Sequence, residues 1–324
     1  MQKELISELF SPLVSFIITT SKHQKEYLVE CIKSILQLSL NPKEREIILI
    51  DDGSDICPLN DLAEYLPNII YLRQPNQGVS VARNYGIKIA TGKYIQFIDG
   101  DDYILQAPYE HCLDIVRYHQ PDIVTFNYCK KNKTIEPSYE LPTPVTGTYF
   151  LKNNNLQGSA CSYIFRHSII GSLQFTPGLI YGEDEEFTPK LFLRAERIFK
   201  INTEAYFYRD NKNSVSHQYT KEKIQLRMDN SLEVLLHLQQ LLDKLPIAER
   251  QALSRRIAQL SMDYLYNNIR LHHSLISLNQ AINNLREHGL YPLPDKKYTK
   301  KYTMFRRAIN TYLGRIALLF FVKK

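Results

Sequence analysis

With 324 residues, of which 44% are hydrophobic and 23% charged, the chain has the composition of a globular protein with a packed core. Its net charge of +6 is concentrated at one end. Residues 296–324 contain nine Lys or Arg and no acid, which leaves 31 basic against 34 acidic residues, a net −3, elsewhere. This distribution argues against a broad nucleic-acid-binding face and favours one localised contact with an anionic partner.

Short β-branched segments alternate with segments of helical periodicity over residues 13–126. The expected strands cover residues 13–19, 46–50, 69–72, 94–98 and 122–126. Helices are expected between them, near residues 28–36 and 80–90. This is the pattern of βαβ units, and it predicts an α/β fold with a mainly parallel sheet.

After residue 129 the sequence pattern changes at two places, near residue 130 and near residue 220. Residues 130–146 are rich in Pro, Thr and Asn and predict a hairpin or surface loop. A strand, a helix and an extended segment are expected after it, at 160–165, 185–193 and 198–208. From about residue 220, leucines recur at helical spacing. We therefore expect an α/β domain over 1–218 and an α-helical C-terminal region over 219–324.

Acidic residues follow two of the expected strands. Asp51-Asp52-Gly53-Ser54 follows the strand at 46–50, and Asp99-Gly100-Asp101-Asp102 follows the strand at 94–98. The carboxyl ends of parallel strands form the ligand edge of an open sheet. Carboxylates in an Asp-x-Asp arrangement suit Mg²⁺ or Mn²⁺ that bridges to phosphate oxygens. The alternatives are a helix cap for the first cluster and a solvated acidic turn for the second.

Two further segments carry candidate site residues. Residues 76–86 are rich in glycine and small side chains, and Arg83 within them is either a surface residue or a contact to a nucleotide's base or phosphates. Glu183 and Asp184 precede an expected helix. They either favour the helix N-terminus or supply the carboxylate that deprotonates a hydroxyl. The chain contains neither a G-x-G-x-x-G motif nor a Walker loop.

The five cysteines are scattered and form no C-x-x-C pair. They predict neither a disulfide scaffold nor a zinc site and favour a reducing cytoplasm. Residues 1–12 lack the apolar core of a signal peptide. The longest purely apolar run, Ile316–Val322, is far shorter than the roughly 20 residues of a spanning helix. We therefore expect a cytoplasmic protein that does not cross a membrane.

These segments, in this order, resemble family 2 glycosyltransferases, which have the GT-A fold. The matching pieces are Val14-Ser15-Phe16-Ile17-Ile18, Tyr27-Leu28 through Ser34-Ile35-Leu36, Ile50-Asp51-Asp52-Gly53-Ser54, Ala82-Arg83-Asn84-x-Gly86, the run from Gly92 to Asp102, Gly182-Glu183-Asp184 and Tyr208-Arg209. The resemblance covers residues 13–216. It implies a Rossmann-like central sheet flanked by helices, which binds a nucleotide diphosphate sugar.

For the donor, the resemblance implies that Asp52 recognises the nucleobase, with Asp51 beside it, and that Arg83 lies against the nucleotide. The family usually has Pro-x-aromatic-Asn after the first strand, where this chain has Thr-Thr-Ser-Lys at 19–22. Ser21 cannot stack on a base, so base recognition would depend on Asp52 and Arg83. A UDP-linked sugar is the expected donor.

For catalysis, the resemblance implies that Asp101 binds Mn²⁺ or Mg²⁺ and that Asp99 lies near the ribose or near the waters of the metal. Asp184 would be the general base, with Glu183 as its substitute. His217 stands where some relatives have another metal or phosphate contact. A lone histidine is also often structural or solvated.

The implied reaction is a metal-dependent, inverting transfer of one sugar to a hydroxyl of a saccharide or lipid-linked saccharide. By analogy of fold, the product would be a bacterial capsule, O-antigen or other surface polysaccharide. The chain has no Trp and therefore lacks the Gln-x-x-Arg-Trp signature of processive synthases. The alternatives are a non-catalytic nucleotide-sugar- or carbohydrate-binding relative of the same fold, and a sugar nucleotidyltransferase. The second usually has a Gly-rich basic loop after its first strand.

The basic tail predicts an amphipathic helix. Apolar residues between Phe305 and Phe320 fall on one helical face, and basic residues fall on the other. Such a helix suits an anionic membrane surface. Because a lipid-linked acceptor would lie in that membrane, residues 296–324 predict a peripheral location at the inner face of the plasma membrane. The alternative is a helix packed on the protein's own body.

Overall fold

The computed structural model describes residues 11–21, 24–131, 139–210 and 220–322. They form two compact units. The first unit contains the described residues up to Gly147 and those from Gln157 to 210. The second unit contains Thr148–Leu156 and the described residues from 220 onward.

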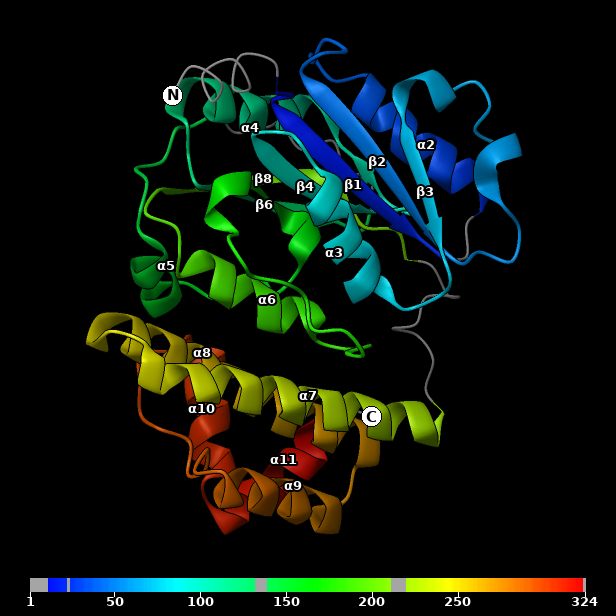
Figure 1. The fold of residues 1–324 in the computed structure, drawn as a ribbon. Coiled ribbons are helices and arrows are strands. Elements are labelled where there is room, and N and C mark those ends of the chain that lie inside the picture. The colour runs from blue at the N-terminus through cyan, green and yellow to red at the C-terminus, as the bar shows by residue number, and fades with distance from the viewer. Residues whose placement is uncertain (1–10, 22–23, 132–138, 211–219, 323–324) are drawn as a thin grey trace. The chain divides into compact units, whose positions relative to one another are not determined.

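The first unit is built on one eight-stranded sheet, in the order β3-β2-β1-β4-β7-β6-β8-β5 (Figure 1). The strands are β1 (Val14–Thr20), β2 (Arg45–Asp52), β3 (Ile70–Gln74), β4 (Tyr94–Asp99), β5 (Tyr103–Ile104), β6 (Ile123–Cys129), β7 (Tyr163–Arg166) and β8 (Ile198–Phe207). Strands β3, β2, β1 and β4 are parallel, as are β6 and β8, whereas β7 runs antiparallel to β4 and β6. The expected mainly parallel α/β sheet is confirmed.

The central parallel strands β1, β2 and β4 are rich in apolar residues, most of which are buried, as expected where helices cover a sheet. Phe16 and Ile17 in β1 and Ile95 in β4 are fully buried. The helices of this unit include α2 (Lys25–Leu36), α3 (Val79–Ile89), α4 (Gln106–His119) and α6 (Glu183–Phe192). Helix α3 contacts β1 and β2, and α4 contacts β6 and β8.

One close contact sets the position of α3 on the sheet. A Cβ atom added at Gly86 would lie 2.3 Å from Cγ2 of Ile17 in β1, so only glycine lets the helix lie this near the strand. Arg83 is on the same helix, three residues earlier, and is itself buried. The glycine therefore helps to hold Arg83 against the carboxyl edge of the sheet.

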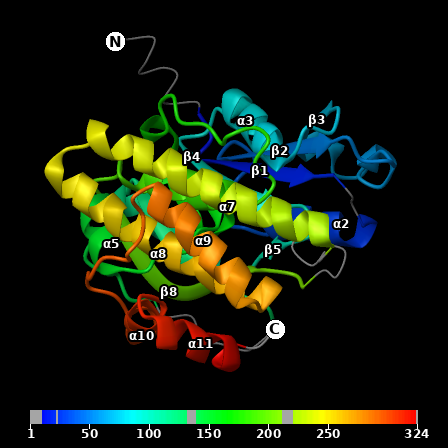
Figure 2. The ribbon, with the colours of Figure 1, turned by 90° about the horizontal axis from the view of Figure 1, so that it is seen from below.

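The second unit is helical, which confirms the expected C-terminal helices (Figure 2). Its helices are most of α5 (Gly147–Asn153), α7 (Lys221–Leu241), α8 (Ile247–His272), α9 (Leu275–Glu287), α10 (Lys300–Ile309) and α11 (Tyr312–Phe321). Helix α8 packs on both α7 and α9, and α10 packs on α11. Within the part of the chain that the structure describes, no helix combines the length and apolar character that a membrane span requires.

Some boundaries differ from the expected ones. The helix expected at 185–193 starts two residues earlier, at Glu183. Residues 148–156 fall in the helical unit, because Nη1 of Arg255 in α8 donates to the carbonyl oxygens of Leu151 and Asn154, each at 2.9 Å. The single helix expected in the tail is two helices, since the Thr311 hydroxyl caps a new one at Gly314 N. The catalytic role expected for residues 1–218 stays a prediction.

Candidate active site

The ends of β2 and β4 meet on either side of β1. Thr20 of β1 pairs with Asp51, and the neighbouring Thr19 pairs with Asp99. The parallel register therefore brings the two acidic clusters to one edge of the sheet, as the sequence predicted. This is the edge at which open α/β sheets bind ligands.

A buried guanidinium gathers three carboxylates at this edge. Nη1 of Arg83 lies 2.5 Å from Oδ1 of Asp184 and 3.2 Å from Oε1 of Glu183, and its Nη2 lies 3.1 Å from Oδ1 of Asp99. The guanidinium carbon is 5.3 Å from the ring centre of Phe175. We call Arg83, Asp99, Glu183 and Asp184 the Arg83 cluster.

The Arg83 cluster has three carboxyl groups and one guanidinium. Because burial disfavours uncompensated charge, it raises the pKa of the carboxyl groups. Burial raises the pKa of Glu183 to about 8, with a further contribution from Asp184. Burial also raises the pKa of Asp184, although Arg83 opposes the shift. Burial by itself would lower the pKa of Arg83, but Asp184 and Asp99 hold that pKa well above its ordinary value.

Asp184 is held from two sides. Its Oδ1 accepts from Arg83, and its Oδ2 accepts the backbone N–H of Ala160 at 2.9 Å. It lies in the first turn of α6, which begins after Gly182 in a left-handed conformation (φ 83°). Because Ala160 is far from Asp184 in sequence, no local pattern pointed to this contact.

The three aspartates at the end of β4, Asp99, Asp101 and Asp102, differ in burial and in hydrogen-bond partners. Asp102 is 1% exposed, and its carboxylate accepts from the Tyr206 hydroxyl and from the Arg209 backbone N–H, each at 2.8 Å. Burial raises the pKa of Asp102 to about 8, and Asp99 adds to the shift. Asp99 remains 35% exposed beside Arg83, and Asp101 is half-buried.

Arg209 holds the backbone of the turn after β4. Its Nε donates to the carbonyl oxygen of Asp101 at 2.8 Å, and its guanidinium carbon lies 4.0 Å from the ring centre of Tyr27. The sequence placed Arg209 in a matching segment but gave it no role, and Tyr206 had no sequence signal at all. The Tyr206 hydroxyl also accepts the backbone N–H of Asp99 at 3.2 Å, so Tyr206 and Arg209 hold the backbone at Asp99 and Asp101.

The carboxylates at this edge fit a hard divalent cation that is bound together with the phosphates of a nucleotide. Among the residues that the structure describes, no group of three or more His, Cys, Asp or Glu side chains has a metal-binding arrangement. Mg²⁺ in nucleotide sites is usually held by one or two carboxylates together with substrate phosphates. Asp99 and Asp101 can supply those carboxylates, whereas Asp102 is committed to Tyr206 and Arg209. His217 lies outside the described residues.

Asp51 and Asp52 shape the loops beside the site. Asp52 is 4% exposed and accepts from Nε2 of Gln74 at 2.8 Å and from the backbone N–H groups of Gln77 and Gly78, both at 2.9 Å. Asp51 is fully buried and accepts from the Ser54 backbone N–H and the Tyr71 hydroxyl. Their expected roles in nucleotide binding stay predictions.

Comparison of the sequence with known proteins identifies relatives. The family model described as Glycosyl transferase family 2 matches residues 15–170. The chain is 32% identical over 222 residues to the uncharacterized glycosyltransferase EpsJ of Bacillus subtilis, covering 63% of each chain. It is 26% identical over 258 residues to glycosyltransferase GlyA of Streptococcus pneumoniae, covering 74% of this chain and 36% of GlyA. The chain thus spans less than two thirds of the length of these relatives.

Solved structures share the fold. The Staphylococcus aureus TarS 1–349 structure in complex with UDP-GlcNAc has a TM-score of 0.71 at 20% identity, with 94% of this chain and 88% of that chain covered. The mannosyltransferase PcManGT from Pyrobaculum calidifontis, in complex with GDP-Man and Mn²⁺, has a TM-score of 0.57 at 13% identity, with 97% and 89% covered. These likenesses support the GT-A fold.

Proposed function

We propose that the chain transfers one sugar from a UDP-linked donor to an acceptor hydroxyl, with inversion. The match of residues 15–170 to the model of glycosyl transferase family 2 supports this proposal. The observation that carries the proposal is the Arg83 cluster, which links the end of β4 to the first turn of α6 through one guanidinium. A transferase needs donor-binding and proton-accepting carboxylates near each other, and these two segments can supply them.

The donor's diphosphate would bind beside Asp99 and Asp101, which would hold Mg²⁺ or Mn²⁺ with it. Bound there, the cation would offset the negative charge that develops on the leaving diphosphate. The base would lie near Asp52, whose carboxylate accepts three hydrogen bonds from residues 74–78. A carboxylate has about four lone-pair sites, so one remains for a base N–H. The complexes of TarS with UDP-GlcNAc and of PcManGT with GDP-Man and Mn²⁺ support a nucleotide-sugar donor.

Asp184 would act as the general base. It would take the proton from the acceptor hydroxyl while that oxygen attacks the anomeric carbon and the bond to the diphosphate breaks. The raised pKa of Asp184 makes it a stronger base than an exposed aspartate. Burial and the neighbouring Asp184 raise the pKa of Glu183 to about 8, which favours its protonated form and makes it the poorer proton acceptor. A single displacement inverts the anomeric configuration.

The biological role we propose is the synthesis of a bacterial surface polysaccharide, with a saccharide or lipid-linked saccharide as acceptor, in the cytoplasm. Two relatives support it by name. The minor teichoic acid biosynthesis protein GgaB of Bacillus subtilis is 28% identical over 194 residues. The poly(ribitol-phosphate) beta-N-acetylglucosaminyltransferase TarS of Staphylococcus aureus is 23% identical over 198 residues.

The donor-binding and base roles can be tested separately. UDP-sugars are screened with Mn²⁺ for thermal stabilisation, and turnover is followed by UDP release. Asp184→Asn should keep donor binding and lower turnover by about 10²–10⁴-fold, whereas Asp101→Ala should weaken both. Asp114→Asn, which changes a 58% exposed aspartate in α4, is the matched control. Turnover of Asp184→Asn within a few-fold of the original chain would refute the base assignment.

We also propose that α10 and α11 contact an anionic membrane surface. Five large apolar side chains there are 60–83% exposed: Met304, Tyr312, Leu313, Phe320 and Phe321. Basic side chains accompany them, and each Lys or Arg near an anionic surface contributes about 1 kcal/mol. On centrifugation, the protein should co-sediment with vesicles that contain phosphatidylglycerol and should not co-sediment with vesicles of phosphatidylcholine alone.

The double substitution Phe320→Ser with Phe321→Ser should abolish that sedimentation. Ile276→Ser in α9 removes a side chain of comparable exposure, 74%, and should leave sedimentation unchanged. Equal binding of the double variant and the original chain would show that these helices are not the contact.

A further inference from the structure

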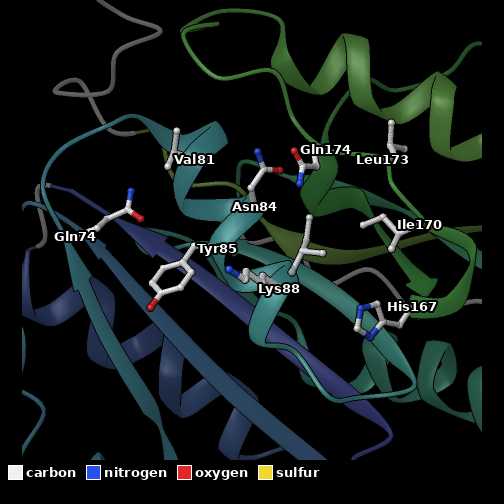
Figure 3. A pocket seen from close by; sticks show the side chains of 11 residues that line it. Gln74, Val81, Asn84, Tyr85, Lys88, His167, Ile170, Leu173 and Gln174 are labelled. Atoms are coloured by element: carbon white, nitrogen blue, oxygen red, sulfur yellow. The ribbon is translucent and has the colours of Figure 1, made fainter.

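A groove runs along α3 in the first unit (Figure 3). Its volume is about 670 Å³, which is within the usual range for small-molecule sites. Residues of α3 form one wall, and residues between 167 and 174, which follow β7, form the other. From Val81 to Lys88 the helical wall is ~10 Å long, at 1.5 Å per residue.

Paired hydrogen bonds hold the two walls together. Nδ2 of Asn84 donates to the carbonyl oxygen of Phe175 at 2.8 Å, and the Phe175 backbone N–H donates to Oδ1 of Asn84 at 2.9 Å. Because this pair fixes the second wall to α3, the groove is already formed in the absence of a ligand.

The lining of the groove favours an anionic, hydroxyl-rich ligand. It contains Lys88 and His167 but no Asp or Glu. Within the described residues Lys88 has no ion-pair partner. Tyr85 lies three residues before Lys88 on the same face of α3, which offers a ring beside a cation. The amide of Gln174 on the opposite wall can exchange hydrogen bonds with hydroxyl groups.

Two residues at the groove, Gln74 and Phe175, also contact residues of the proposed donor site. Gln74 lines the groove, and Nε2 of Gln74 donates to Asp52 at 2.8 Å. Phe175, which joins the two walls, packs 5.3 Å from the guanidinium carbon of Arg83. A long ligand in the groove would therefore lie next to the residues that are proposed to bind the donor.

We infer that this groove binds the acceptor, a saccharide or polyol chain that carries carboxylate or phosphate groups. A carboxylate or phosphate of this acceptor pairs with Lys88, and a sugar ring or polyol segment of the acceptor lies on the Tyr85 ring. The inference rests on the proposed glycosyl transfer, because it names the class of acceptor for that reaction.

The experiment compares charged and neutral probes of the same shape by calorimetry on the full chain. Tetragalacturonic acid is paired with its methyl ester, and ribitol 5-phosphate is paired with ribitol. We expect the charged member of one pair to bind about two- to fivefold more tightly at low salt, the range for an exposed ion pair. Preference in the first pair identifies a carboxylate, and preference in the second identifies a phosphate.

Lys88→Gln should remove the preference, and Lys43→Gln, which changes an exposed lysine outside the groove, should keep it. Equal binding within both pairs, or a preference that survives Lys88→Gln, overturns the inference. Titration of UDP with Mn²⁺ into the original chain separates the two proposals. If UDP binds without any charge preference, the groove assignment fails alone. If a Lys88-dependent preference appears without UDP binding, the donor proposal fails alone.

Discussion

Replacing Arg83 by methionine should reveal how much the Arg83 cluster depends on its one cation. The guanidinium is 4% exposed and pairs with Asp99, Glu183 and Asp184. Removing one partner of a buried ion pair typically costs about 3–5 kcal/mol, because the remaining charges stay buried without compensation. We expect a loss of that size in the free energy of unfolding of Arg83→Met at pH 8.

The loss should shrink as the pH falls. Burial raises the folded-state pKa of Glu183 from 4.5 to about 8 and raises that of Asp184 as well. The folded state therefore binds more protons than the unfolded state across this window, and stability falls as the pH rises through it. In Arg83→Met the same carboxyls lack their counter-charge, so the variant should lose more stability than the original chain between about pH 5 and pH 8.

Urea unfolding at pH 5 and pH 8 measures both effects. Arg197→Met is the control, because Arg197 is exposed and a surface substitution of this kind usually changes stability by less than about 0.5 kcal/mol. A loss for Arg83→Met that is below about 1 kcal/mol at pH 8, or equal at the two pH values, would refute the reasoning.

Two substitutions test the supports of the site. Gly86→Ala places a Cβ 2.3 Å from Cγ2 of Ile17, so it should cost about 1–3 kcal/mol and lower the melting temperature; an unchanged melting temperature would mean that α3 can move away from β1. Tyr206→Phe removes the hydroxyl that donates to Asp102 at 2.8 Å and should cost about 1–3 kcal/mol, because it leaves a buried acceptor short of a donor. Urea unfolding measures the loss of stability in Tyr206→Phe. A loss no larger than that of Tyr118→Phe, which changes an exposed tyrosine, would contradict this prediction.

The sequence was sufficient to predict the sheet edge because most residues of β1, β2 and β4 are buried. Their central residues are mostly apolar, and the acidic residues at their carboxyl ends, Asp51-Asp52 in β2 and Asp99 in β4, mark the edge of the sheet. Parallel pairing through β1 then brings these two positions together. The resemblance to the family added the order of the segments and the expected roles.

The Arg83 cluster could not be predicted in the same way. Arg83 and Asp184 are 101 positions apart, and their contact depends on how α6 returns to the sheet after β7. The periodicity of α3 gives no sign that its arginine is buried among acids. The sequence also could not show that residues 148–156 are part of the helical unit. Their hydrogen bonds to Arg255 join positions about 100 residues apart.

Three aspartates within four residues would repel one another strongly if all of them faced the same space. The turn after β4 avoids this by giving each one a different partner or exposure. Asp102 is buried under Tyr206 and Arg209, and Asp99 faces Arg83. Asp101, whose carbonyl oxygen is fixed by Arg209, stays half-buried. A sequence pattern does not distinguish the three acids, whereas in the structure Asp102 is the most buried of them. If Asp99 and Asp101 hold the cation as we propose, their substitution should weaken metal-dependent donor binding and that of Asp102 should act mainly on stability.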